Sequence, residues 1–131
     1  MATEILINDG GAPARILPYT AAEAIVAGDA CTIDANGELQ KADSANGSGQ
    51  GFAYAGIALT NAADGDIASL ITGVGVVLNI NCADLAAGVA LMMGTTAGRL
   101  LAATQATTVP KCQAVTLEDN SAAGLTKCQT L

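Results

Sequence analysis

Turn-forming residues interrupt this sequence so often that no long helix fits between them. The chain has 15 glycines in 131 residues, and its apolar residues nowhere keep the i, i+3, i+4, i+7 spacing of an amphipathic helix over three turns without meeting one. Short apolar or alternating runs fill the intervals. Turn signals recur about every 8–12 residues, a spacing typical of small β-sandwiches and β-barrels. We therefore expect an all-β fold, a small β-barrel or β-sandwich of short strands.

Strands are expected at 30–34, 38–42, 53–59, 67–72 and 74–80. Between the first two, Asn36 and Gly37 supply the positive φ angles that a tight hairpin turn needs. Residues 44–51 have the composition of a loop. One helix is also considered, at 19–27, where Thr20 can cap the first turn and Glu23 completes a capping box.

The second half of the chain weakly repeats the first, at an offset of about 60 residues. Ala27-Gly28-Asp29-Ala30 corresponds to Ala87-Gly88-Val89-Ala90, and Gly37-Glu38-Leu39 corresponds to Gly98-Arg99-Leu100. The candidate half-repeats are 24–75 and 84–131, which would form two packed β-layers or one closed barrel. Chance similarity in a chain rich in alanine and glycine is the alternative.

Residues 1–20 differ from the single β domain that we expect over 21–131. They form an extended, apolar arm, in which Pro13 and Pro18 argue against a regular central strand. Such an arm either adds a strand to the sheet edge of a neighbouring molecule or forms the first edge strand of its own fold.

Charge and residue usage exclude several functions. Five Lys and Arg residues stand against 12 Asp and Glu residues, for a net charge of −7, so we expect no nucleic acid and no anionic membrane as partner. The sequence shows no signal peptide and no apolar run of about 18 residues that would span a bilayer.

The residues of common active sites are missing as well. There is no histidine, which removes the usual general base and the commonest zinc ligand. Cys31, Cys82, Cys112 and Cys128 form no Cys-x-x-Cys pair, and we expect them to be reduced, small apolar residues. The segment 34–38 resembles part of a calcium loop but lacks the bidentate glutamate that closes such a loop at the right distance. We predict no catalytic, cofactor-binding or metal-binding residues.

A series of short motifs resembles a known family, the small capsid cement (decoration) proteins of tailed bacteriophages, and in outline the head decoration protein of phage lambda. The motifs are the runs Ile16-Leu17-Pro18-Tyr19, Ala27-Gly28-Asp29-Ala30, Asn36-Gly37-Glu38-Leu39, Gly56-Ile57-Ala58-Leu59 and Asp64-Gly65-Asp66. They are turn and strand signatures, and the resemblance extends over residues 12–131.

The resemblance implies a compact, β-tulip-like domain on the outer surface of a virion, made in the host cytoplasm. It implies homotrimers, or dimers, that bridge neighbouring copies of the major capsid protein and have no enzymatic activity. We expect the contact to the capsid or to another subunit to involve the apolar residues of the arm: Ile5, Leu6, Ile7, Ile16, Leu17 and Tyr19. The alternatives are a small oligomeric β adaptor or ligand-binding module and, as a third class, a hydrolytic or redox enzyme.

Overall fold

A computed structural model of the chain describes residues 5–7, 13–42, 54–83, 85–93, 96–102, 113–120 and 122–131. Every regular element in these ranges is a β-strand, which confirms the all-β expectation. The helix considered at 19–27 is wrong, because Tyr19 and Thr20 end a strand, and Ala21 and Ile25 make isolated β-bridges.

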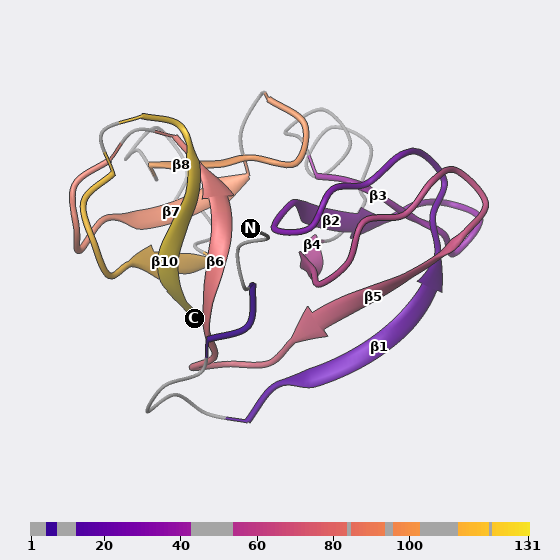
Figure 1. The fold of residues 1–131 in the computed structure, drawn as a ribbon, viewed down its shortest axis with the longest axis horizontal. Helices are drawn as coiled ribbons and strands as arrows, with labels where there is room; N and C mark the ends of the chain where they lie inside the picture. The colour runs from indigo at the N-terminus through magenta and orange to yellow at the C-terminus, as the bar shows by residue number, and fades with distance from the viewer. Residues whose placement is uncertain are drawn as a thin grey trace.

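The strands in chain order are β1 (Arg15–Thr20), β2 (Ala30–Ile33), β3 (Leu39–Lys41), β4 (Tyr54–Ala58), β5 (Ile67–Thr72), β6 (Val77–Cys82), β7 (Ala90–Met93), β8 (Leu100–Ala102), β9 (Ala114–Thr116) and β10 (Gly124–Thr130). The first five form one sheet in the order β1-β5-β4-β2-β3, and the last five form a closed barrel in the order β10-β6-β8-β7-β9. Figure 1 shows these two halves side by side, the sheet in indigo to magenta and the barrel in orange to yellow.

The two halves have the same strand pairing. In the first half β1 pairs with β5, with Tyr19 opposite Ala68. In the second half β6 pairs with β10, with Ile80 opposite Thr126. Ile80 lies 61 positions after Tyr19, and Thr126 lies 58 positions after Ala68, so the register is preserved.

The hairpins follow the same rule. β2 pairs with β3, with Ile33 opposite Leu39, and β7 pairs with β8, with Met93 opposite Leu100. β4 and β9 are likewise equivalent, since each joins the hairpin to the last strand of its half.

Both halves also close in the same way. The second half closes through a parallel pair between Cys82 of β6 and Leu100 of β8. The first half has the equivalent parallel contact as an isolated bridge between Ala21 and Leu39. The chain is therefore built from two similar five-stranded units, and these units begin with β1 and β6, earlier than the half-repeat boundaries at residues 24 and 84.

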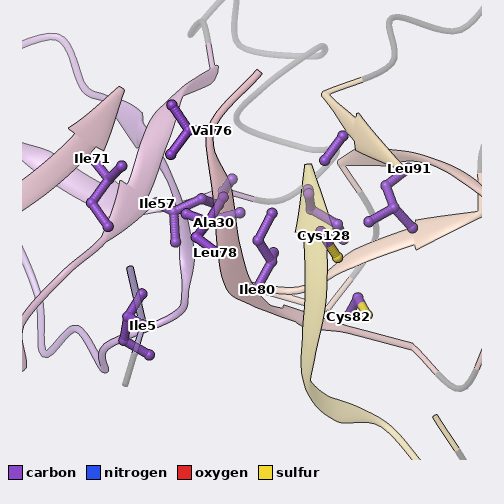
Figure 2. Close-up of a cluster of buried hydrophobic side chains, with 13 residues drawn as sticks. Ile5, Ala30, Ile57, Ile71, Val76, Leu78, Ile80, Cys82, Leu91 and Cys128 are labelled. Atoms are coloured by element: carbon purple, nitrogen blue, oxygen red, sulfur yellow. The ribbon is translucent and has the colours of Figure 1, made fainter. Parts of the chain in front are cut away.

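Each half has its own apolar interior. The buried cluster of the first half is Ala21, Ile25, Cys31, Leu39, Ala58, Ala68 and Leu70. A second cluster contains the barrel interior, with Ile80, Leu91 and Leu100, and continues into the junction with Ile57 and Ile71 of the first half (Figure 2). The junction is thus part of the core, and the two halves are packed against each other through buried side chains.

Backbone hydrogen bonds also join the halves. Asn81 N donates to Gly28 O at 2.8 Å, and Ala30 N donates to Gly98 O at 2.9 Å. Gly98 N in turn donates to Ala42 O at 2.9 Å. The turn at Gly98 of the second half is therefore held between two segments of the first.

Candidate interaction surface

The segment of residues 5–7 belongs to the fold of its own chain. Asn79 N donates to Ile5 O at 2.7 Å, and Ile7 N donates to Val77 O at 3.1 Å. Leu6 makes an antiparallel bridge with Leu78. Ile5 is only 5% exposed and packs in the core. In this conformation Ile5 is covered by its own chain and offers no contact surface to a partner.

The other residues expected to make contacts lie in β1, along the lower rim of Figure 1. Ile16 is 47% exposed. Leu17 is half-buried, and Tyr19, also half-buried, packs against the interior of the first half. The structure therefore does not bring the six candidate residues into one patch, and Ile16 is the most accessible of the three in β1.

The direction of the amides in β1 follows from two hydrogen bonds just beyond its end. Ala21 N donates to Asp66 O, next to β5, whereas Ala22 N donates to Leu39 O in β3, both at 2.8 Å. Because amide directions alternate along a strand, the odd-numbered residues of β1 direct their amides toward β5. The even-numbered residues direct theirs away from β5, toward the outer edge.

Pro18 is one of the even-numbered residues of β1, whose backbone nitrogens point away from β5. Its missing N–H removes no bond between β1 and β5, so the strand tolerates it as sheet edges do. The sequence argument against a regular central strand agrees with this position, because β1 is the first strand in the order of its sheet. Of the two alternatives for the arm, the structure shows residues 15–20 as an edge strand of the chain's own fold.

A cavity of about 220 Å³ opens at the junction of the two halves. It is lined by Tyr54, Ala55, Gly56, Ile71, Thr72, Gly73, Val74, Gln113, Thr130 and Leu131. Val74 is 73% exposed and Leu131 is 55% exposed, so two large apolar side chains stand at its walls in contact with solvent. Ile71 connects the cavity to the edge strand, since it lies directly opposite Ile16 in the register of β5 and β1.

Among the described residues, the cavity lining carries no carboxylate and no lysine or arginine. Its titratable residue is Tyr54, whose pKa is raised mainly by burial, so this phenol stays protonated at neutral pH. The Tyr54 hydroxyl is buried, and no described residue is its hydrogen-bond partner. The described lining can accept an apolar side chain, but it provides neither a general base nor an activated nucleophile.

The buried cysteines offer no accessible chemistry either. Cys31, Cys82 and Cys128 are free thiols and are buried, while Cys112 lies outside the described residues. Burial, with the nearby charge of Asp29, raises the pKa of Cys31 to about 12.

Cys82 and Cys128 belong to the same buried cluster inside the barrel, where the Cys128 thiol donates to Thr126 O at 3.2 Å. Hydrogen bonds from Cys128, Thr126 and Asn120 lower the pKa of Cys82 to about 7, and burial together with Cys82 raises the pKa of Cys128. Both side chains have an exposed fraction of 0%. A substrate would therefore have to open the barrel to reach the Cys82 thiol.

The sequence analysis missed Val74 and Leu131. A signal for Val74 was present, because a β-branched residue between Gly73 and Gly75 stands in a turn, where side chains are exposed. The cavity itself had no such signal, since it joins residues more than 70 positions apart, such as Tyr54 and Leu131.

Comparisons with known proteins return no match, neither to a protein-family model nor to a curated protein sequence. Within the described ranges, no group of three or more Cys, Asp and Glu residues is arranged to hold a metal ion. No helix in the same ranges has the length and hydropathy to span a bilayer.

Proposed function

We propose that this protein is a structural decoration protein that binds the outer surface of a bacteriophage head and stabilises the shell by bridging neighbouring copies of the major capsid protein. The observation that carries the proposal is the uncharged junction cavity, with Val74 and Leu131 exposed at its walls. An exposed apolar site without catalytic groups suits a binding function. The motif resemblance given above supplies the identity of the partner.

The duplicated architecture supports bridging in particular. Two units with the same strand pairing, joined by a shared buried cluster, present two related surfaces on one chain, and a bridge needs two contacts. Contacts that form together reinforce one another through effective concentration. A protein that binds the assembled shell and not its separate parts stabilises the assembly by mass action.

In this proposal the protein acts as a homo-oligomer on the virion after synthesis in the host cytoplasm. It uses no cofactor and binds neither nucleic acid nor membrane. The net charge of −7 keeps free oligomers soluble and apart from one another until they meet the shell.

Co-sedimentation with purified, expanded phage shells tests the proposal. The wild-type protein is expected to pellet with shells, and Val74→Asp is expected to lose this, because it places a charge in the apolar site. Val26→Asp is the matched control, since Val26 is 55% exposed and does not line the cavity. A wild-type protein that stays in the supernatant, or a Val74→Asp variant that still pellets fully, contradicts the proposal.

Point substitutions test shell binding more specifically than a deletion of residues 1–19. That deletion would remove most of β1 and the segment paired with β6, so a loss of binding would follow from unfolding as readily as from a missing contact.

The second candidate function is a small adaptor or ligand-binding module without catalytic activity. It is favoured by the cavity itself, whose lining combines apolar side chains such as Val74 with polar ones such as Thr72 and Thr130. A screen of small amides and alcohols by thermal shift separates the two functions. A ligand that stabilises the wild-type protein but not the Val74→Asp variant favours the module, because Val74 lines the cavity.

A further inference from the structure

The two equivalent strands β1 and β6 have different neighbours at their outer edges. At β6, Val77 O and Asn79 N point outward and are bonded by the segment 5–7, at 3.1 and 2.7 Å. The outer edge of β6 is therefore a strand-docking site that the chain fills itself.

At β1, the equivalent positions are Ile16 and Pro18, each 61 positions before Val77 and Asn79. The Ile16 amide and carbonyl point outward, and among the described residues none pairs with them. Ile16 is 47% exposed. This edge has the geometry of a docking site without an occupant from the described part of its own chain.

Pro18 limits which strands can pair with the outer edge of β1. On β6, the amide of Asn79 donates to the carbonyl of Ile5 in the docked segment. A segment docked in the same way on β1 would need a donor at Pro18, which is the residue equivalent to Asn79. Proline has no N–H. The occupant must therefore pair in a register that uses the Ile16 amide and carbonyl but only the carbonyl of Pro18.

We propose that the occupant is β1 of a second copy of this chain, paired antiparallel about a two-fold axis at Ile16. In this register the two Ile16 residues exchange both N–H···O bonds. Ala14 lies opposite Pro18, so its N–H donates to the Pro18 carbonyl. Because Pro18 has no N–H, the carbonyl of Ala14 receives no hydrogen bond from the partner strand. This carbonyl lies at each end of the paired segment, where it can bond water instead.

Charge favours a second copy at this edge. The chain carries 12 Asp and Glu residues, yet neither β1 nor β5 contains one, and Arg15 is the single charged residue of the two strands. Two acidic molecules can thus approach here without opposing carboxylates. The contact is isologous, so the same surface serves both partners and the assembly closes as a dimer.

Light scattering coupled to size exclusion, without shells, tests the dimer. The wild-type protein is expected to have the mass of two chains. Ile16→Asp is expected to have the mass of one, because two like charges would face each other across the axis. Ile67→Asp is the matched control, since Ile67 is 62% exposed on β5, away from the edge, and this variant is expected to remain dimeric.

Hydrogen exchange of the wild-type protein gives a second readout that needs no variant. The Ile16 amide is expected to be protected in concentrated samples and to exchange faster on dilution, while amides that point toward β5 do not change. A wild-type mass of one or three chains, a dimeric Ile16→Asp variant, or an unprotected Ile16 amide overturns the proposal. Shell binding is measured separately, so a dimer that ignores shells refutes the proposed function and leaves this pairing intact.

Discussion

Gly98 lies so close to Asp29 that a Cβ atom added to the glycine would meet the aspartate Cγ at 2.8 Å and Oδ1 at 2.9 Å. Asp29 cannot easily move away. It is 5% exposed, and its carboxylate accepts hydrogen bonds from Val26 N at 3.1 Å and Asn81 Nδ2 at 3.2 Å. This close approach between the two halves is thus made by a residue without a side chain.

Gly98→Ala should therefore destabilise the protein more than the same change at Gly37. Both glycines have a φ of 79° and occupy equivalent turns, but a Cβ at Gly37 would meet nothing within 4 Å. The positive φ costs each variant about 1 kcal/mol, and displacing Asp29 adds about 1–3 kcal/mol for Gly98→Ala only. Urea unfolding measures both free energies, and equal losses would show that the junction is looser than the structure has it.

A second pair of glycines tests the same junction at another point. Gly28 has a φ of 94° and faces the Leu125 side chain, whereas Gly88 has a φ of 79° and open space. Gly28→Ala is expected to cost about 1 kcal/mol more than Gly88→Ala, a modest excess because Leu125 is 39% exposed and can turn outward. In a double-mutant cycle, Leu125→Ala should remove this excess. A coupling energy of zero would contradict the contact.

These glycines show what the sequence could and could not predict. The turn at Gly37 was predicted, because the positive φ of an Asn-Gly turn is a local property of a short motif, and the weak repeat pointed to Gly98 as its counterpart. Which member of each pair touches the other half depends on packing between distant segments, and nothing near the glycine in the sequence records it.

The strands follow the same division. Expectations at 30–34, 38–42, 53–59 and 67–72 agree within a residue or two with β2, β3, β4 and β5, because alternation and turn residues are local signals. The expected strand at 74–80 starts three residues before the first residue of β6 (Val77–Cys82) and stops two residues before its last. The start is too early because the apolar Val74 belongs to the turn.

The candidate site was harder to predict than the strands. Apolar character drew attention to Ile5 and Ile16, but it could not show that Ile5 is buried against β6 while Ile16 stays exposed. That difference arises from tertiary pairing, in which Asn79 offers a donor and Pro18 does not.

Alkaline pH should weaken the fold through Cys31. The Cys31 thiol donates to Asp29 O at 3.4 Å, and burial raises its pKa from 9.0 to about 12. Below pH 9 the thiol is protonated in both the folded and the unfolded state, so its contribution to stability is fully present. Between pH 9 and about 12 only the unfolded chain releases the proton, and the free energy of unfolding falls by up to about 1.4 kcal/mol per pH unit.

Cys31→Ala isolates this contribution. Urea unfolding between pH 8 and pH 11 should show a shallower loss of stability for the variant than for the wild-type protein, although the variant starts from a lower value because it leaves a small cavity. Parallel slopes in the two proteins would mean that the Cys31 thiol ionises as readily in the folded state as in the unfolded one.

The last prediction concerns residues 5–7. If they are part of the fold, substituting Ile5 lowers stability, whereas if they are a partner-binding arm, the substitution affects binding instead. Ile5 is 5% exposed and packs in the core cluster, and its carbonyl accepts the Asn79 amide. Ile5→Ala should therefore lower the free energy of unfolding by about 2–3 kcal/mol, near the lower end for a buried isoleucine because the segment lies close to the chain terminus. Ile7→Ala, at a half-buried position of the same segment, should cost clearly less in the same urea titration. If Ile5→Ala left stability unchanged but abolished shell binding, residues 5–7 would be a contact arm, and their pairing with β6 would not be the state in solution.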